Sequence, residues 1–310
     1  MSDRRRVVVV GSINIDLVTR AQRIPAAGET VAGLDFRTHH GGKGANQAVA
    51  VARLGHPVSM IGRTGDDVFG AQLREGLRSA GVDISGVGVS EGSSGVAVII
   101  VSPTGENVIV VTPGANGLVR PADVDANFEM IRSAGVVLAQ LEIPVETVEH
   151  LAAVCAREGV PLMLDPAPAR ELPAALLKRT RWFTPNETEA DFYSGDGPRC
   201  DSPEKIAESL LALGPEEVVL KLGARGVYLR DCDGVGQQID GFRVEAVDTT
   251  AAGDAFNGAF ATALMQGNSA VESARFATAA AAFSVTRPGA QPSMATMREV
   301  EKLLKGQGVT

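Results

Sequence analysis

Cysteine is scarce in this sequence, and the few cysteines are not arranged in a recognisable pattern. The 310 residues include three of them, Cys155, Cys200 and Cys232, and no two form a C-x-x-C pair. An odd number of widely spaced cysteines argues against a disulfide framework and against a cysteine-based zinc site. The spacing predicts a protein of a reducing compartment, and we expect it in the cytoplasm.

Basic residues are also outnumbered. Lys and Arg total 29 against 37 for Asp and Glu, which gives a formal net charge of −8. A nucleic-acid-binding surface needs clustered Lys and Arg to contact phosphates. The one basic run, Arg4-Arg5-Arg6, leads directly into Val7–Val10, so we interpret it as the solvated start of a strand. We therefore expect no nucleic-acid partner.

Long apolar runs are missing as well. No stretch approaches the roughly 18 apolar residues that cross a bilayer. The four valines of Val7–Val10 follow basic residues as in a signal peptide, but Gly11 and Asn14 cut the run short. We therefore expect no membrane span. Aromatic residues make up only 4%, which favours close packing of helices on a sheet over an aromatic-rich barrel.

The composition is that of a globular protein, and the chain alternates between strand and helix patterns. Hydrophobic residues make up 45% and charged residues 21%. We expect strands at 7–10, 58–61, 136–139, 161–164, 182–184 and 217–221, and helices at 45–54, 69–80, 254–265, 270–286 and 294–304. This alternation predicts an α/β fold with a doubly wound, mostly parallel sheet flanked by helices. We expect residues 1–310 to form a single domain.

Two segments interrupt this alternation. The segment at about 16–39 contains the alternating apolar residues Ala32, Leu34 and Phe36. The segment at about 95–112 reads as a hairpin around a Pro103-Thr104-Gly105 turn. Inserted β-segments predict a small side sheet that covers a site as a lid. The alternative is an extension of the edge of the main sheet.

The stretch Val247-Asp-Thr-Thr-Ala-Ala-Gly-Asp254 carries the strongest chemical signal. Phe256 and Phe260 stand four residues apart, which indicates a helix that begins near Gly253. Free N–H groups and a partial positive charge at a helix N-terminus can bind a phosphoryl group. A carboxylate placed there, Asp254, can accept the proton of an attacking hydroxyl. The alternative is that Asp254 is an ordinary first-turn residue.

Polar residues also follow the first strand and open the next helix. Gly11-Ser-Ile-Asn-Ile-Asp16 would leave the carboxyl end of the strand, where ligands of α/β sheets bind, so Asn14 and Asp16 can bond sugar hydroxyls. An Asx turn is the alternative. The glycines of Gly41-Gly-Lys-Gly44 open a helix without the spacing of a Walker A loop or a dinucleotide fingerprint.

Two further stretches have plain structural alternatives. Asn186 and Glu189 stand three apart, as a helix cap and its partner do, or as ligands of nucleotide phosphates and of a magnesium-bound water. Lys221-Leu-Gly-Ala-Arg-Gly226 is a strand followed by a glycine turn, which can pass under a nucleotide. From the residues alone we prefer a plain hairpin turn for this stretch.

Together these residues resemble the ribokinase family of carbohydrate kinases, also called the PfkB family, from Gly11 to Ser293. Gly41-Gly-Lys-Gly-Ala-Asn-Gln47 is similar to the first signature of the family, and Asp248-Thr-Thr-Ala-Ala-Gly-Asp254 to the second. Glu142 and Asp165-Pro-Ala-Pro-Ala169 look most like the members that phosphorylate ribose. The resemblance implies transfer of the ATP γ-phosphate to the O5 hydroxyl of D-ribose, giving D-ribose 5-phosphate and ADP.

The resemblance also implies a role for each matched position. Asp254 would be the base, and the N–H groups of Ala251, Ala252 and Gly253 would form the anion hole for the γ-phosphate. The sugar would be bound by Ser12, Ile13, Asn14, Asp16, Gly41, Gly42, Lys43, Gly44, Asn46 and Glu142. ATP would be contacted by Asn186, Lys221, Gly223, Ala224, Gly226, Gly253 and Thr278.

Two cations and a second subunit follow from the same resemblance. Glu189 would hold Mg²⁺ through water. A monovalent cation, usually K⁺, would take mainly backbone oxygens from Asp248, Thr250, Ser284, Arg287, Gly289 and Ser293. The two inserted segments match the β-lid of the family, which commonly forms a homodimer interface. Lys221, Thr278 and Pro288 depart from the family pattern, the first two near the nucleotide and the third in the cation loop.

Three other functions compete with ribose phosphorylation. A kinase for 2-deoxyribose, fructose or a nucleoside would share the same machinery, although a nucleoside needs an apolar wall and the lid offers little beyond Phe36. A non-catalytic sugar-binding protein on the same fold would be expected to lose Asp254 or the small residues before it. A dehydrogenase would need a dinucleotide fingerprint after the first strand, where the chain has Gly-Ser-Ile-Asn14 instead.

Overall fold

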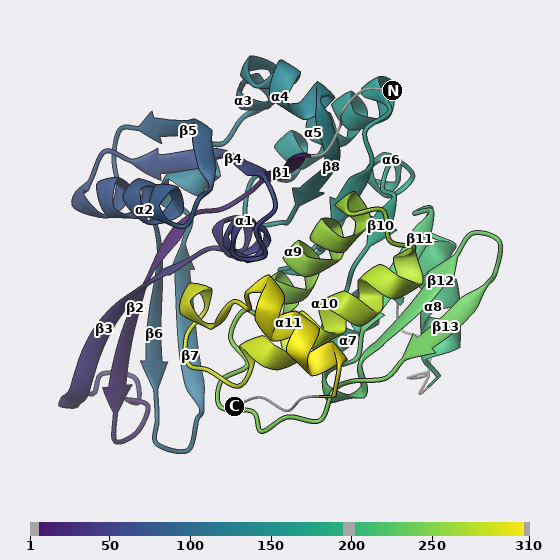
Figure 1. Ribbon diagram of the computed structural model, residues 1–310. Coiled ribbons are helices and arrows are strands. Elements are labelled where there is room, and N and C mark those ends of the chain that lie inside the picture. Colours follow the sequence, from purple (N-terminus) through teal and green to yellow (C-terminus); the bar gives the residue numbers. More distant parts are fainter. Residues whose placement is uncertain (1–5, 195–201, 307–310) are drawn as a thin grey trace.

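The computed structural model describes residues 6–194 and 202–306, and Figure 1 shows how their elements are arranged. Arg4, Arg5 and Cys200 lie outside the described residues, and of the basic run the structure describes Arg6, which begins the first strand and pairs with Asp83. Within the described ranges, no helix has the length and apolar content needed to cross a membrane.

The central element is a nine-stranded sheet in the order β13-β12-β11-β10-β9-β8-β1-β4-β5. Its strands are β1 (Arg6–Val10), β4 (Val58–Gly65), β5 (Asp83–Ser90), β8 (Ala134–Ala139), β9 (Leu162–Leu164), β10 (Trp182–Phe183), β11 (Glu217–Lys221), β12 (Val227–Asp231) and β13 (Gly236–Ile239). All pairs from β5 to β11 are parallel, and β12 and β13 are antiparallel. The predicted mostly parallel sheet is confirmed.

Helices cover both faces of this sheet (Figure 1). They are α1 (Lys43–Arg53), α2 (Val68–Ser79), α3 (Pro121–Ala126), α4 (Phe128–Arg132), α5 (Val145–Glu158), α6 (Ala174–Leu177), α7 (Glu187–Ser194), α8 (Pro203–Leu211), α9 (Ala252–Met265), α10 (Ala270–Ser284) and α11 (Met297–Leu304). Short 3₁₀ turns occur at Gly114–Leu118, Gly223–Arg225 and Gln291–Ser293.

The two faces of β1 belong to two separate cores, because successive side chains of a strand point to opposite sides. Val7 and Val9 pack in the core that contains Phe256 and Phe260 of α9. Val8 and Val10 pack in the other core, with residues of α5 such as Leu151. All four valines are fully buried, as an uninterrupted β-branched run predicts for a central parallel strand.

The two inserted segments form a separate four-stranded sheet in the order β3-β2-β6-β7. Its two outer pairs are antiparallel, and the central pair β2–β6 is parallel. Its strands are β2 (Asn14–Ala21), β3 (Gly33–Gly41), β6 (Gly95–Val101) and β7 (Asn107–Thr112). The sheet extends to one side of the central sheet in Figure 1, at the purple and blue end of the chain. A small side sheet is therefore confirmed, and an edge extension of the main sheet is excluded.

The predicted element bounds agree with the structure to within a few residues, but some elements were not foreseen. The strand β5 and the β12–β13 hairpin had no assignment from the sequence pattern. The predicted helix at 294–304 starts later, at Met297, because a 3₁₀ turn occupies Gln291–Ser293 and Thr296 caps the helix with Glu299.

Candidate active site

The loop after β1 and the start of α1 are joined by one carboxylate, Glu142. The Ser12 hydroxyl donates a hydrogen bond to Glu142 Oε2, and the backbone N–H of Lys43 donates to the same oxygen at 3.0 Å. The loop and the helix N-terminus are tight against each other, because a Cβ added to Gly42 would lie 2.7 Å from the Asn14 nitrogen. Gly42 also has a φ of 87°, which only glycine adopts without strain.

Asn14 is held in place by a residue that sequence reasoning missed, Asn116. The Asn116 amide donates to Asn14 Oδ1 at 2.6 Å, and Asn116 Oδ1 accepts from the Ile13 N–H at 2.8 Å. Asn116 is 1% exposed and lies on the 3₁₀ turn that follows β7. A buried asparagine in a turn has too little local pattern for the sequence to reveal this partnership.

Asp16 lies on β2, on the face of the side sheet that also carries Asn14. Its carboxylate occupies the space beside Gly41, where an added Cβ would lie 2.2 Å from Oδ2. Burial raises the pKa of Asp16 to about 7, and the negative charges of Glu142 and Asp254 add to the shift. Asp16 can therefore either donate to or accept from a ligand hydroxyl near neutral pH.

Asp254 sits in the first turn of α9 and is 4% exposed. Two amides from α1 hold its carboxylate: Asn46 Nδ2 donates to Oδ2 at 3.0 Å, and Gln47 Nε2 donates to Oδ1 at 3.1 Å. Burial raises the pKa of Asp254 to about 6, while the ammonium of Lys43 lowers it and the charge of Asp165 raises it. A fixed, buried carboxylate with a pKa near neutrality suits a general base.

Lys43 is the cation at the centre of these acids. Burial would lower the pKa of its ammonium, but the negative charges of Asp254, Asp165 and Glu142 outweigh burial and the pKa is raised. Lys43 therefore stays charged in this site. Asn14, Asp16, Lys43, Asn46, Glu142 and Asp254 thus come together from β2, α1, the segment after β8 and α9, and they offer both donors and acceptors to a polyhydroxylated ligand.

The N-terminus of α9 has the features of an anion site. Ala251 has a φ of 59° and is the one non-glycine residue of the described chain with a positive φ, a strain that concentrates at functional sites. The Ala252 N–H donates to Thr249 O at 3.2 Å, so one of the three predicted anion-hole donors is already engaged. Within the described residues, the N–H groups of Ala251 and Gly253 have no protein acceptor.

A cavity of about 620 Å³ lies beside this helix start. All seven residues predicted to contact a nucleotide line it: Asn186, Lys221, Gly223, Ala224, Gly226, Gly253 and Thr278. Its remaining walls are largely apolar and include Phe256 of α9 together with Phe242 and Val244, which no sequence motif singled out. The glycine turn after β11 is thus both an antiparallel hairpin connection and a cavity wall.

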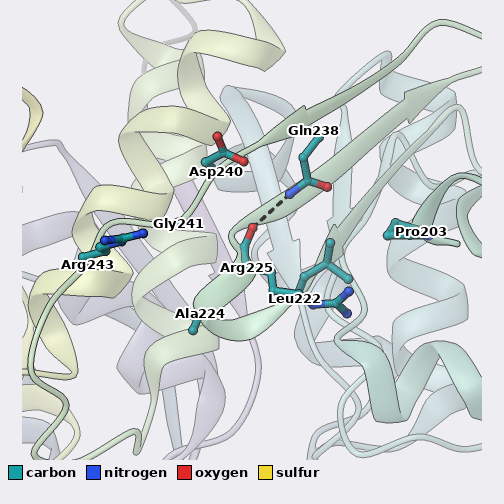
Figure 2. Close-up of a pocket in the computed structure, with 8 residues that line it drawn as sticks. All are labelled: Pro203, Leu222, Ala224, Arg225, Gln238, Asp240, Gly241 and Arg243. Atoms are coloured by element: carbon teal, nitrogen blue, oxygen red, sulfur yellow. Dashed lines mark hydrogen bonds between the residues drawn. The ribbon is translucent and has the colours of Figure 1, made fainter. Parts of the chain in front are cut away.

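A second cavity of about 380 Å³ borders the first and shares Ala224, Gly241 and Arg243 with it. Figure 2 shows its lining residues, with Arg243 and Arg225 reaching in from different segments. The Gln238 amide donates to the Arg225 carbonyl at 2.9 Å and fixes the turn against β13. The side cavity therefore widens the space around the glycine turn.

The predicted ligands of Mg²⁺ and of nucleotide phosphates form a helix cap. The Asn186 N–H donates to Glu189 Oε2 at 2.8 Å, and the Glu189 N–H donates to Asn186 Oδ1 at 2.9 Å. Burial raises the pKa of Glu189, partly offset by the ammonium of Lys221. No group of three or more His, Cys, Asp or Glu side chains in the described chain could by itself hold a metal ion.

Asp248 ties together the two loops predicted to bind a monovalent cation. Its Oδ1 accepts from the Thr250 N–H at 2.9 Å, and its Oδ2 accepts from the Gly289 N–H at 2.8 Å. Ser284 and Ser293 donate their hydroxyls to nearby carbonyls, and Arg287 instead contacts Glu299 and the Phe283 ring. The two loops are adjacent, and their oxygen atoms are the donor type that hard cations prefer.

A buried polar chain lies behind Asp254, and of its members only Lys221 had a role predicted from the sequence, as a nucleotide contact. Gln47 Nε2 donates to Asp165 Oδ2 at 3.0 Å as well as to Asp254. Gln140 Nε2 donates to Gln47 Oε1 at 2.7 Å, and Lys221 Nζ donates to Asp165 Oδ1 at 2.9 Å. Asp165 directly follows β9, and a polar residue at the carboxyl end of a parallel strand is the signal that could have identified it.

Known proteins share this arrangement. A family model described as pfkB family carbohydrate kinase matches residues 4–297. Ribokinase of Bacillus subtilis is 42% identical over 302 residues, covering 97% of this chain and 99% of that protein. Deoxyribokinase of Salmonella typhi is 36% identical over 301 residues, covering 96% and 98%.

A solved structure agrees in fold as well as in sequence. Arabidopsis thaliana ribokinase complexed with ribose and ATP superposes with a TM-score of 0.90 and 36% identity, covering 96% of this chain and 98% of that one. The family match spans almost the whole chain, including both signature stretches and the side sheet. This chain belongs to the pfkB family of carbohydrate kinases.

Proposed function

We propose that this enzyme transfers the γ-phosphate of ATP to the O5 hydroxyl of D-ribose, giving D-ribose 5-phosphate and ADP. The observation that carries the proposal is the place of Asp254, whose buried carboxylate is held by two amides at the N-terminus of α9. On one side lies the polar cluster around Lys43, and on the other the large cavity that Gly253 lines. Similarity to ribokinases supports ribose as the sugar.

The chemistry follows from these positions. Asn14, Asp16 and Lys43 bind the sugar hydroxyls, and Asp254 accepts the O5 proton as oxygen attacks the γ-phosphorus in line with the leaving ADP oxygen. The free N–H groups of Ala251 and Gly253 stabilise the charge on the transferring group. The side sheet closes over the sugar and excludes water, which limits hydrolysis of ATP.

We also propose Mg²⁺ and K⁺ as cofactors. Glu189 follows two residues that line the large cavity, and its carboxylate, which caps α7, would hold Mg²⁺ through water. Asp248, Thr250, Ser284, Arg287, Gly289 and Ser293 would hold K⁺. When bound, Mg²⁺ supplies charge neutralisation at the phosphates, and K⁺ supports the conformation of the loops that flank Ala251.

A homodimer through the side sheet is a further part of the proposal. The strand pairing of the side sheet places four apolar residues on the face opposite to Asn14 and Asp16: Phe36, Val98, Val108 and Val110. With Leu34 they form an outer apolar patch, each between 43% and 61% exposed. An exposed apolar patch of this kind marks an association surface. Cys155 and Cys232 are free thiols, which supports a reducing, cytoplasmic location.

A second candidate substrate is 2-deoxyribose, which the similarity to a deoxyribokinase favours. A nucleoside is not favoured, because Phe36, the aromatic residue of the side sheet that could have lined a base, lies on the outer face and is 61% exposed. Pentoses are therefore favoured over nucleosides as substrates.

A coupled assay of ADP release tests the proposal. ATP and Mg²⁺ are supplied with ribose, 2-deoxyribose, fructose or adenosine, first with K⁺ and then with Na⁺. We expect the highest kcat/KM with ribose and a larger value in K⁺ than in Na⁺. A preference for another substrate would overturn ribose while leaving the role of Asp254 in place, and no ADP release with any of them would overturn the kinase proposal.

A further inference from the structure

Lys221 is a buried cation at the end of a central strand. It is the last residue of β11, and its side chain is only 12% exposed. Its backbone is fixed on one side by a hydrogen bond from its N–H to Pro185 O at 2.8 Å and a bridge to Asn186, and on the other side by pairing with Val227 of β12. A lysine is seldom buried without a partner or a function, because its ammonium loses solvation.

The ammonium of Lys221 lies against the start of α9. A Cβ added to Gly253 would lie 3.4 Å from Nζ, and both residues line the 620 Å³ cavity. The free N–H of Gly253 and the ammonium therefore converge on the same wall of the cavity. A helix N-terminus and a neighbouring ammonium together attract multiply charged anions.

Asp165 holds this ammonium in place. Its Oδ1 accepts from Lys221 Nζ at 2.9 Å, and its other oxygen accepts from Gln47. Asp165 is 3% exposed, so the pair is shielded from solvent. An ammonium has three donors, and one hydrogen bond to Asp165 leaves two for a ligand in the cavity.

We propose that Lys221 binds the terminal phosphates of a nucleoside triphosphate during transfer, and that Asp165 is the positioning residue that aims its ammonium at the first turn of α9. The inference rests on the proposed kinase function and deepens it by assigning a cation to the phosphates. No bond to Lys221 forms or breaks. Its charge offsets the negative charge that develops on the transferring group and on the ADP oxygen.

A purely structural role for Lys221 makes a different prediction. In that case Lys221 only neutralises Asp165, and Lys221→Met disturbs the site by leaving a buried carboxylate unpaired. The double variant Lys221→Met/Asp165→Asn removes that unpaired charge. If the role is structural, the double variant regains both thermal stability and nucleotide affinity. If Lys221 binds phosphate, it regains stability but not affinity for the triphosphate.

The test is calorimetric binding of a non-hydrolysable ATP analogue, ADP and AMP to the full chain, with Mg²⁺ and without sugar. We expect Lys221→Met, alone and in the double variant, to raise the dissociation constant of the ATP analogue about tenfold or more, the scale of a charge-assisted contact. We expect the dissociation constant of AMP to stay within about twofold of its value for the parent protein. Lys178→Met, which removes an exposed lysine outside the cavity lining, serves as the matched charge control.

The outcomes separate this inference from the choice of sugar. Equal losses of affinity for the ATP analogue and for AMP would overturn the role of Lys221 at the phosphates. Restored affinity for the ATP analogue in the double variant would overturn it as well. Because no sugar and no turnover are involved, a substrate other than ribose would leave this result unchanged. A chain that binds no nucleotide at all would contradict the kinase proposal and this inference together, and ADP release by the parent protein would exclude that case.

Discussion

At the scale of single residues, the site is organised by where carboxylates are placed and what surrounds them. Asp16 and Asp254 both have a raised pKa because burial disfavours their charged forms. Asp248, in contrast, has a lowered pKa, because hydrogen bonds from Thr250 and the Gly289 N–H outweigh its partial burial. The same residue type thus has the pKa suited to a base in one place and that of a structural anchor in another.

The raised pKa of Asp254 has a cost in stability that can be measured. The pKa of this carboxyl rises from an ordinary 3.8 to about 6 on folding. Its ionisation therefore destabilises the fold fully at pH values above both pKa values, and not at all at pH values below both. We predict that Asp254→Asn raises the free energy of unfolding by about 1–3 kcal/mol at pH 8. The gain should shrink as the pH falls from 6 towards 4.

Denaturant unfolding at a series of pH values checks this. Asp233→Asn, a change of the same kind at an exposed position, should show no such pH-dependent gain. An Asp254→Asn variant that is no more stable than the parent at pH 8 would contradict the assigned environment of Asp254.

Lys43 should influence both sugar binding and the base. Its ammonium holds the pKa of Asp254 below the value that burial alone would give, so its loss should raise that pKa. Because the base must be ionised to act, activity is lost as the pH falls through this pKa. We predict that Lys43→Met raises KM for the sugar about tenfold and moves the acid limb of the kcat profile to higher pH, by about one unit.

The control for this measurement is Lys178→Met, which removes an exposed charge elsewhere. A Lys43→Met variant with a higher KM and an unmoved acid limb would limit Lys43 to sugar binding. That result would contradict its electrostatic role towards Asp254.

At the scale of elements, most of what positions the site was predictable from local pattern. The four consecutive valines of Val7–Val10 indicate a buried strand, and Phe256 and Phe260 at helical spacing indicate a helix, both through interactions between near neighbours in the sequence. Asn116, Gln47 and Asp165 were not predictable in this way. Each acts on a residue about 100 positions away or more, and such pairings depend on the packing of the whole sheet.

The side sheet makes a prediction of its own, because its two faces differ. The inner face carries Asn14 and Asp16, and the outer apolar patch is free within the monomer. We predict that Phe36→Glu converts a dimer to a monomer, since a charge in an apolar interface loses its solvation. Light scattering after size-exclusion chromatography gives the mass directly.

Val235→Glu is the matched control, since Val235 is 66% exposed and lies outside the side sheet. It should leave the mass unchanged. A parent protein that is monomeric at high concentration, or a Phe36→Glu variant that stays dimeric, would contradict the assignment of the outer apolar patch as the interface.

At the scale of the whole molecule, one helix terminus lies between the two groups of residues proposed to bind the sugar and the nucleotide. The predicted sugar residues come from the loop after β1, the side sheet, α1 and the segment after β8. The predicted nucleotide residues come from β11 and the turn after it, from the residue before α7 and from α10, and the start of α9 carries members of both predicted groups. The doubly wound sheet makes this possible, because the carboxyl ends of β1, β8, β9 and β11 all open on the same edge. The proposed phosphoryl transfer requires that Asp254 act as the base at this one point.

The most direct test of that claim is the turnover of Asp254→Asn in the ADP-release assay, with sugar affinity measured in parallel by calorimetry. We predict that kcat falls by about 10² or more, the scale of a general base, while the dissociation constant for ribose stays within about threefold of the parent value. A variant with near-parental kcat would contradict the role of Asp254 as the catalytic base.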